Sequence, residues 1–507
     1  MASKIVIKHS RIEINNYEMG DSPRLEYTFS VWDPITHRSY AKGIEYDQEK
    51  KQLRIPRGVD IEYIRNMFAC EPIVDKNCDP HIETEPISIK YLARDERQIS
   101  IMKFILGLDE YKYTSSKSQL SCNSTTGSGK TYVTIAAMCY SGLRGIIITS
   151  SLQWLEQWKA RILEYTPLSE KQIYMISGSS SINKLLTRGN PEQYQIFLAS
   201  HSTIKSYGDH QGWDKVEEFF KFLQVGIKVY DEAHLYFDNM CKIDYHSNTR
   251  KTLYLTATPA RSSREENLIY QLYFKNVPSI SLFDEENDPH VNYVAVHFSS
   301  HPTPYDINQC KNQYGLNRNK YCSYLVKKEC FLKLTAVLID MVLNKPGKVL
   351  IYIGTNSGIN VIKQYLIETF PFLENYIGVY TSVVPAEEKA HALQKKIILS
   401  TTKSCGAASD IADLGVTINL AEPFRSEVLS RQTLGRCRAD NTLYLDLVDH
   451  GFYQTKNYYS AKKPIFSKYA KSCKDIHMSD EEINQRYDDI IQKYQQYKVM
   501  CMPVYKK

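Results

Sequence analysis

STTGSGKT, the stretch from Ser124 to Thr131, precedes the helix-like run VTIAAMCY and is the starting point for interpreting the chain. Its glycines let backbone N–H groups curl around phosphate oxygens. The helix that follows directs the positive end of its dipole at the same anion. In such a loop Lys130 would reach the β- and γ-phosphates, and the Thr131 hydroxyl would bind Mg²⁺. We therefore expect the nucleotide contacts Thr126, Gly127, Ser128, Gly129, Lys130 and Thr131.

A second polar cluster follows the apolar run in VGIKVYDEAH, where Asp231 and Glu232 end a predicted buried strand. Parallel α/β sheets bind ligands outside the carboxyl ends of their strands. Asp231 would hold Mg²⁺ through water, and Glu232 would polarise the attacking water as general base. His234 is expected to link the nucleotide state to nucleic-acid binding.

Short apolar runs alternate with amphipathic helices in two series, which predicts an α/β protein with two doubly wound parallel-sheet lobes. The first series is GIIIT, IFLAS, IKVYD and TLYLTAT. The second is KVLIYIG, IGVYT, KIILST, VTINLA and TLYLDLVD. The lobe boundary is expected between Asn267 and Pro289. The predicted division is 1–85 for a small N-terminal α/β module, 86–280 and 281–455 for the lobes, and 456–507 for a basic and helical extension.

The two ends of the chain have their own patterns. In the first 85 residues we expect strands in KIVIKHSRIEI and RLEYTFSVWD and a helix in DIEYIRNMF, with a proline-rich linker after them. Near the other end, Ser479 and Glu482 form a capping box that opens a helix. The helix carries one apolar stripe, made of Ile483, Tyr487, Ile490, Ile491 and Tyr494.

The composition narrows the class of protein. Hydrophobic residues make up 43% and charged residues 24%, as in folded globular proteins. The net charge of +6 is mild, so a basic surface must be local. The cysteines show no zinc spacing, no apolar run approaches the ~20 residues of a membrane span, and the N-terminus lacks a signal-peptide core. We expect free thiols and a cytoplasmic protein, in the host cytoplasm if a phage encodes it.

In their order, STTGSGKT, DEAH, LTATPAR and QTLGR resemble the signature motifs of superfamily 2 helicases with a DEAH box. The motifs extend from about Arg94 to Asp449, most of the chain. The resemblance implies two RecA-like lobes that hydrolyse ATP with Mg²⁺ in the cleft between them. It implies DNA as partner and no membrane association. The oligomeric state stays undetermined, and a monomer is one alternative.

The resemblance also assigns further positions. LARDERQ is similar to the adenine-reading segment, which assigns Arg94 and Gln98. IIITSSLQWLEQW is similar to motif Ia, which implies backbone contacts from Ser151 and Gln153. Motif III assigns Thr256 and Thr258 to nucleic-acid contact and to the coupling of hydrolysis with strand movement. Motifs V and VI assign four nucleotide contacts, Gly406, Asp410, Gln432 and Arg436.

Motif VI departs from the family pattern, since Ala439 stands where the final arginine is usual and Arg438 lies one residue earlier. One helical residue is about 100° of rotation. Arg436 is therefore the main arginine finger, and whether Arg438 reaches the γ-phosphate stays open. A compact chain with a small N-terminal module and no large insertion after motif VI is most similar to the phage UvsW-type helicases, which remodel forks and migrate branches.

Two basic segments are candidates for gripping nucleic acid. The stretch from Lys456 to Lys474, with Lys462 and Lys463, interleaves lysines with aromatic residues. It suits either a backbone groove with base stacking or a solvated face whose aromatics dock on the second lobe. A basic turn in the N-terminal module carries Lys50, Lys51, Arg54 and Arg57. By resemblance the turn would contact duplex DNA, although its charge alone is equally consistent with a solvated turn.

The sequence leaves other functions open. An RNA helicase, the motor of a restriction system and a non-hydrolysing ATP-switched clamp remain alternatives to a helicase on forked or branched DNA. If the N-terminal module is a second DNA grip, a chain without residues 1–85 should remain a folded ATPase and lose affinity for junctions. His210, Asp214 and His246 match no standard metal site.

Overall fold

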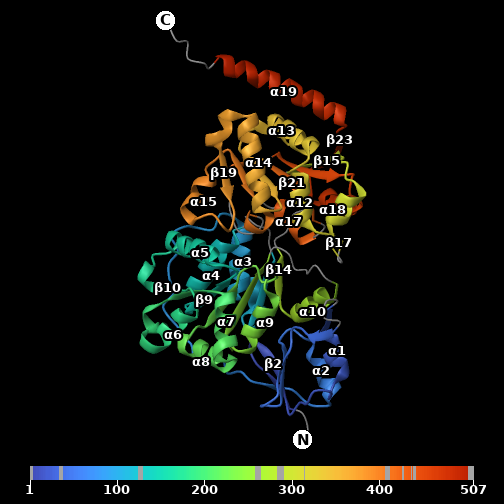
Figure 1. Ribbon diagram of the computed structural model, residues 1–507. Coiled ribbons are helices and arrows are strands. Elements are labelled where there is room, and N and C mark those ends of the chain that lie inside the picture. Colours follow the sequence, from blue (N-terminus) through green and yellow to red (C-terminus); the bar gives the residue numbers. More distant parts are fainter. Residues whose placement is uncertain are drawn as a thin grey trace. The chain divides into compact units, whose positions relative to one another are not determined.

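The computed structural model describes residues 4–33, 38–123, 129–256, 264–281, 291–312, 315–405, 411–424, 427–434, 437 and 441–500. The chain divides into two compact units, Met1–Phe283 and Asp284–Lys507. Each unit is built on a seven-stranded sheet whose strands lie between helices (Figure 1). The predicted α/β fold, with two RecA-like lobes and a small N-terminal sheet, is confirmed.

The large sheet of the first unit is parallel throughout and has the order β10-β11-β9-β12-β13-β8-β14. Its central strands are continuously apolar and buried, because helices cover both faces. The strands are β8 (Gln119–Asn123), β9 (Gly145–Thr149), β10 (Ile173–Ile176), β11 (Ile196–Ser200), β12 (Ile227–Tyr230), β13 (Lys251–Thr256) and β14 (Ser279–Ser281). The helices are α3 (Glu96–Leu106), α4 (Lys130–Tyr140), α5 (Leu152–Tyr165), α6 (Ser179–Arg188), α7 (His201–Gln211), α8 (Trp213–Leu223), α9 (Phe237–Tyr245) and α10 (Arg264–Phe274), with short 3-10 turns η1 (Asp109–Thr114), η2 (Glu170–Gln172) and η3 (Pro191–Gln193).

The N-terminal module is a five-stranded sheet of order β5-β6-β2-β1-β7 with two helices and a separate hairpin. The expected strand in RLEYT is wrong: Pro23–Thr28 is helix α1, which Pro23 begins and whose Leu25 backbone N–H donates to the Ser22 hydroxyl. The other elements are β1 (Lys4–Ile7), β2 (Arg11–Asn15), β3 (Ser30–Asp33), β4 (Arg38–Ala41), β5 (Glu45–Asp47), β6 (Gln52–Pro56), α2 (Ile61–Phe68) and β7 (Ile73–Val74).

The module and the first lobe share one hydrophobic core. Leu25, Phe29 and Ile55 of the module belong to the same buried cluster as Phe237 and Tyr273 of the lobe. Polar contacts reinforce the packing: the Tyr245 hydroxyl donates to Gly43 O at 2.5 Å, and Asn276 N donates to Gly58 O at 3.1 Å. The module therefore covers an apolar face of the lobe and lies in the same compact unit.

The sheet of the second unit is also parallel, with the order β19-β20-β18-β21-β22-β15-β23. A two-stranded hairpin lies outside it. The strands are β15 (Val291–Phe298), β16 (Lys311–Asn312), β17 (Gly315–Leu316), β18 (Lys348–Ile353), β19 (Ile377–Tyr380), β20 (Ile397–Ser400), β21 (Leu414–Ala421), β22 (Thr442–Asp449) and β23 (Ser472–His477). The helices are α11 (Pro304–Gln309), α12 (Arg318–Leu325), α13 (Glu329–Leu343), α14 (Asn356–Thr369), η4 (Pro371–Tyr376), α15 (Ala386–Ala392), α16 (Thr402–Cys405), α17 (Glu427–Leu434), α18 (Tyr453–Tyr469) and α19 (Asp480–Met500).

The C-terminal helix α19 packs beside α13 on the second unit (Figure 1). It begins where the sequence predicts, since Glu482 N donates to the Ser479 hydroxyl at 3.2 Å. Its apolar stripe lies inward: Ile483 and Ile490 are buried, and Tyr487 and Tyr494 pack against the same core. Within the described residues, no helix combines the length and apolar character needed to cross a membrane.

Candidate nucleotide site

The nucleotide-site residues predicted from the sequence converge at the carboxyl ends of β8 and β12, which flank β13 in the sheet. Lys130 is the first residue of α4, and Asp231 and Glu232 follow β12 directly. The Lys130 ammonium lies 3.8 Å from Glu232 Oε1, and both side chains are largely buried. This convergence follows from parallel strands presenting their carboxyl ends at one edge.

Asp231 has a partner that sequence reasoning missed. The Trp158 indole N–H, on α5, donates to Asp231 Oδ2 at 2.9 Å. Burial and the adjacent Glu232 carboxylate raise the pKa of Asp231 to about 6, while Lys130 and the Trp158 hydrogen bond oppose that rise. A carboxylate next to another carboxylate, with Lys130 as the neighbouring positive charge among the described residues, is electrostatically suited to a further cation.

Glu232 is held in a constrained position. Its φ of +51° lies in the left-handed region, an uncommon conformation for a non-glycine residue and one that clusters at functional sites. Among the described residues, no hydrogen-bond donor serves Glu232 Oε2, although His234 Nδ1 lies 3.4 Å from it. A buried carboxylate oxygen left open in this way can accept a hydrogen bond from water, as a general base must.

His234 connects two of the predicted motifs. Its Nδ1 lies 2.8 Å from the hydroxyl of Thr256, the last residue of β13. Both side chains are buried. Thr256 was predicted to touch nucleic acid, but burial and this contact point to a different role, inside the protein between β12 and β13.

The segment predicted to read adenine lies against Gly129. Gly129 has φ +89°, and a Cβ there would come within 2.1 Å of Gln98 Nε2. The Gln98 side-chain oxygen accepts from Arg94 N at 2.8 Å, so the buried amide is fixed in orientation. The Arg94 side chain is largely exposed and pairs with Asp95 at 3.1 Å. Only glycine fits at position 129, for reasons of both space and φ.

These residues fit ATP and Mg²⁺. The open Glu232 oxygen, the paired Asp231 and Glu232 carboxylates and the close approach of Gly129 to Gln98 mark a site built for an additional group. Asp231 and the half-buried Thr131 offer the oxygen ligands that Mg²⁺ prefers. Lys130 at the N-terminus of α4 offers positive charge to phosphates.

Several predicted residues lie outside the described part of the chain. They are Thr126, Gly127, Ser128, Thr258, Gly406, Asp410, Arg436 and Arg438, together with the side chains of Gln153 and Gln432. Ser151 is described and forms the N-cap of α5, just beyond the carboxyl end of β9.

The lysine-rich stretch forms α18 and β23, and its described aromatics dock on the second unit. Phe466 is buried and stacks on Tyr293 with ring centroids 4.1 Å apart. Lys462 does not match the predicted nucleic-acid contact, because it is buried and donates to Asp446 Oδ2 at 2.6 Å. Lys463 is half-exposed and donates to Asp475 Oδ2 at 2.8 Å. The docking alternative therefore describes this segment better than the stacking groove.

The basic turn of the N-terminal module is largely neutralised. Arg54 is buried beside Glu45 and Glu217, at 3.4 and 3.5 Å. Lys50 pairs with Asp214 at 2.8 Å, and Lys51 pairs with Glu18 at 2.5 Å. Arg57 is also mostly withdrawn from solvent, and burial lowers its pKa. The turn therefore offers less free positive charge than its sequence implies.

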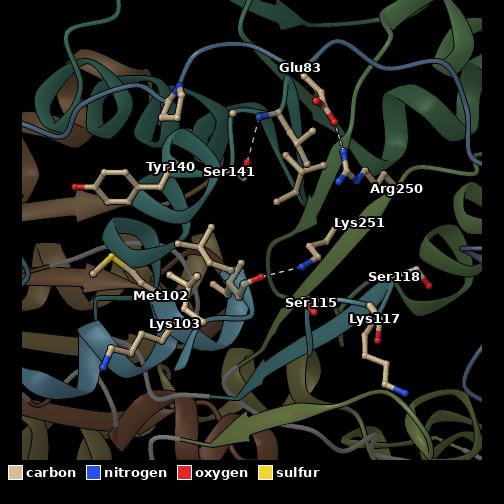
Figure 2. A pocket seen from close by; sticks show the side chains of 18 of the residues that line it. Glu83, Met102, Lys103, Ser115, Lys117, Ser118, Tyr140, Ser141, Arg250 and Lys251 are labelled. Atoms are coloured by element: carbon tan, nitrogen blue, oxygen red, sulfur yellow. Dashed lines mark hydrogen bonds and ion pairs between the residues drawn. The ribbon is translucent and has the colours of Figure 1, made fainter. Parts of the chain in front are cut away.

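A pocket of about 970 Å³ opens at the opposite edge of the first sheet, where β8, β9, β12 and β13 begin (Figure 2). Lys251 points into it and donates to Ile105 O at 3.0 Å, while Arg250 pairs with Glu83 at its rim. Burial, with a smaller effect of Arg250, lowers the pKa of Lys251 to about 8. Because nucleotides bind at the carboxyl edge of such sheets, this pocket is separate from the nucleotide site.

Comparison with known proteins finds similarity to a family model, to curated proteins and to solved structures. The family model described as type III restriction enzyme, res subunit, matches residues 91–261. A Haloarcula marismortui protein named for the DNA 3'-5' helicase Rad25 is 27% identical over 271 residues, which are 50% of this chain and 41% of that protein. The DNA 3'-5' helicase XPB of Mycobacterium tuberculosis is 27% identical over 146 residues, 29% of this chain and 24% of that protein.

The matches thus span less than half the length of these two relatives. Among solved structures, a Saccharomyces cerevisiae Dbp5 variant bound to RNA and ADP–BeF3 has 14% identity and a TM-score of 0.50, over 78% of this chain and 96% of that one. This likeness supports the fold. With the ordered motifs and the convergent site, these sequence matches make the chain similar to helicases of superfamily 2.

Proposed function

We propose that this chain is an ATP-dependent DNA helicase or translocase. The observation that carries the proposal is the convergence of Lys130, Asp231 and Glu232 at one sheet edge, with an open oxygen on Glu232. Two relatives named for DNA 3'-5' helicases favour DNA over RNA as the track.

In this proposal each described residue has a separate task. Lys130 releases its contact with Glu232 and binds the β- and γ-phosphates. Glu232 accepts the proton of the attacking water through Oε2. Asp231 and Thr131 would hold Mg²⁺, which would supply positive charge close to the phosphate oxygens. Gln98, fixed by Arg94 N, contacts the adenine. Arg436 is proposed as the arginine finger on the basis of its place in motif VI alone.

His234 and Thr256 are proposed to transmit the nucleotide state. Their contact joins the end of β12 to the end of β13, after which the chain continues into the rest of motif III. A movement of Glu232 around the nucleotide would reach His234 first, because the two side chains are 3.4 Å apart.

The test is phosphate release measured with duplex DNA, single-stranded DNA, a four-way junction and RNA added in turn. We expect DNA to stimulate hydrolysis and the Lys130→Ala variant to be inactive with every track, while its circular dichroism and melting temperature match the wild type. Lys103→Ala on α3, whose ammonium pairs with Asp109 away from the site, is the control and should keep its activity. Wild-type turnover in Lys130→Ala would overturn the site.

The finer proposal is that the motor remodels forked and branched DNA, as the UvsW-type resemblance implies. Unwinding assays on forked, four-way and plain duplex substrates test it, and equal rates on all three would leave a helicase without preference for branched DNA. A second candidate is the motor of a restriction system, which the description of the matched family model favours. In that case ATP hydrolysis would require duplex DNA and produce no strand separation.

A further inference from the structure

Three histidines that are far apart in the sequence meet at the carboxyl edge of the second sheet. His297 lies on β15 and pairs in register with His477 on the edge strand β23. On the other side of β15, Phe298 pairs with Asp449, the last residue of β22, and His450 follows it. Neighbouring parallel strands therefore present one imidazole each at the same place.

The imidazoles are close enough to share a ligand. One ring nitrogen of each histidine lies within 4.8 Å of one ring nitrogen of the other two. His297 Nδ1 and His450 Nε2 are 2.8 Å apart, and the His297 and His477 rings stack with centroids separated by 4.5 Å. His297 is buried, whereas His450 and His477 are exposed. The His297 ligand is thus held inside the protein, whereas His450 and His477 face solvent.

A carboxylate orients the buried ring. Asp475, also on β23, places Oδ1 at 3.2 Å from His297 Nε2. Lys463 donates to the other oxygen of Asp475 at 2.8 Å, which holds the carboxylate in its charged form. With its Nε2–H directed at Asp475, the neutral His297 ring has its lone pair on Nδ1, facing His450. A carboxylate behind a ligating histidine is the usual outer-sphere arrangement of protein metal sites.

A second cluster of possible metal ligands already has a positive side chain of the protein beside it. Asp214, Glu217 and His246 also bring ligand atoms within 4.8 Å of one another. There, the Arg54 guanidinium lies 3.0 Å from His246 and 3.5 Å from Glu217. The positive charge that those carboxylates require comes from the protein itself, so this cluster carries no metal proposal.

We propose that His297, His450 and His477 bind a divalent transition-metal ion, with Zn²⁺ as the expected occupant. Three neutral imidazoles suit Zn²⁺, whereas Mg²⁺ and Ca²⁺ prefer oxygen ligands. Zn–N bonds of ~2.0–2.1 Å in a tetrahedral site separate the nitrogens by roughly 3.3 Å. The closest pair must therefore open slightly, which rotation of the exposed His450 ring allows. The fourth position would face solvent and hold water.

Such an ion would link three adjacent strands at one end of the sheet. β23 is the edge strand and leads directly into α19, so the metal would fasten the C-terminal elements to the second unit. Because the ligands assemble only in the folded protein, binding should raise its thermal stability. This site is independent of the proposed ATPase.

The experiment titrates the metal-free full chain with Co²⁺ and records visible absorption, in which a tetrahedral nitrogen-rich site gives characteristic bands. We expect one equivalent of Co²⁺ with such bands, displaced by Zn²⁺, and a higher melting temperature with Zn²⁺. His450→Ala and His477→Ala, both exposed positions, should lose the bands and the Zn²⁺-dependent stabilisation.

His391→Ala on α15 removes another exposed histidine of the same unit and is the matched control, expected to bind like the wild type. It is needed because the chain has 13 histidines that can bind metal weakly. The proposal is overturned if the wild type shows no such bands, or if His450→Ala and His477→Ala bind Co²⁺ and Zn²⁺ as the control does.

Discussion

At the scale of single residues, the contact between Gly129 and Gln98 gives a sharp test of the nucleotide site. Gly129→Ala adds a Cβ 2.1 Å from Gln98 Nε2 and imposes a left-handed φ on alanine. The backbone strain alone costs ~1–2 kcal/mol, and displacement of Gln98 adds to it. The displaced Gln98 and loop backbone would contact ATP less well, and we expect ATP affinity to fall at least ~10-fold, the factor that corresponds to 1.4 kcal/mol of binding free energy. Titration with a fluorescent ATP analogue measures it.

The matched control for that substitution is Gly212→Ala, where φ is +95° and no atom lies within 4 Å of the added Cβ. It should lower the melting temperature slightly and leave ATP affinity unchanged. Equal losses of affinity in both variants would mean that general destabilisation, rather than the Gln98 contact, explains the result.

Glu232 offers a second prediction, which separates binding from chemistry. Glu232→Gln keeps the shape of the side chain and its neighbour His234, but removes the proton acceptor at Oε2. We expect hydrolysis at least ~10²-fold slower, the lower range for loss of a general base, with ATP and DNA binding retained. Single-turnover phosphate release, alongside nucleotide binding, measures both. Hydrolysis near the wild-type rate would assign the base elsewhere.

Which residues meet at the site was only partly predictable from sequence. Lys130 and Glu232 could be placed together from their motifs: Lys130 opens a helix after a glycine loop, and Glu232 lies just beyond a predicted buried strand, where such sheets bind ligands. Trp158 lies within α5, so its bond to Asp231 depends on how that helix packs. The His297 cluster has the same origin: strand order, which no local pattern records, brings its members together.

At the scale of elements, a charged network joins the N-terminal sheet to helix α8. Glu217 on α8 contacts Arg54 of β6 at 3.5 Å and His246 at 3.4 Å. Burial alone would raise the pKa of Glu217, but His246, Arg11 and Arg54 together outweigh it and lower the pKa to about 2. The folded pKa lies below the ordinary value of 4.5, so the ionised carboxylate stabilises the fold.

This network predicts how stability depends on pH. The contribution of Glu217 is fully present above pH 4.5 and is lost as the pH falls toward 2. Glu217→Gln should therefore lower the melting temperature at pH 7, at a cost on the order of 1–3 kcal/mol for a charged hydrogen-bonding group. The difference from the wild type should stay constant down to about pH 5 and shrink below it.

The control is Glu218→Gln, one residue along α8, where the exposed carboxylate pairs only with Lys215 among the described residues. Exposed pairs of this kind contribute ~0–1 kcal/mol, so its melting curve should follow the wild type at each pH. Calorimetry between pH 4 and 7 measures all three proteins. A Glu217→Gln deficit that grows as the pH falls would contradict the assignment.

Continuously apolar runs predict their strands correctly. GIIIT became β9, and KVLIYIG became β18, because continuous β-branched runs suit strands covered on both faces. Strand β8 was not predicted, because its sequence QLSCN is mostly polar, although most of its residues are buried in the sheet. RLEYT alternates like a strand, yet the Ser22 cap and Pro23 make it helix α1. Local signals at a helix start outweighed alternation there.

At the scale of the whole molecule, the N-terminal module determines how the first unit holds together. Its core residues join those of the lobe in one cluster, and a Cβ at Gly58 would meet the Tyr273 carbonyl oxygen at 2.0 Å. Such close backbone approach is typical of a permanent interface rather than of a tethered accessory domain. The expectation that the module can be removed as a separate DNA grip therefore has to be revised.

We predict instead that a chain lacking residues 1–85 aggregates or melts far below the full chain. The deletion would uncover several buried aromatic residues of the lobe, among them Phe237, Tyr270 and Tyr273. Exposing one such side chain costs ~1.5–3 kcal/mol, while the net stability of a whole domain is only ~5–15 kcal/mol. Light scattering and thermal melting would detect the loss, and a soluble truncated chain with normal ATPase activity would contradict it.

The matched control keeps the core and removes only charge. Lys50→Ala combined with Lys51→Ala leaves the buried cluster untouched, so the protein should stay folded. Because these lysines already pair with Asp214 and Glu18, we expect the salt dependence of duplex binding to remain that of the wild type. Each lost phosphate contact would instead reduce the slope of log K against log salt by ~0.9. Fluorescence anisotropy at several salt concentrations measures that slope. A reduction near ~1.8 for the double variant would restore the module as a DNA-binding element.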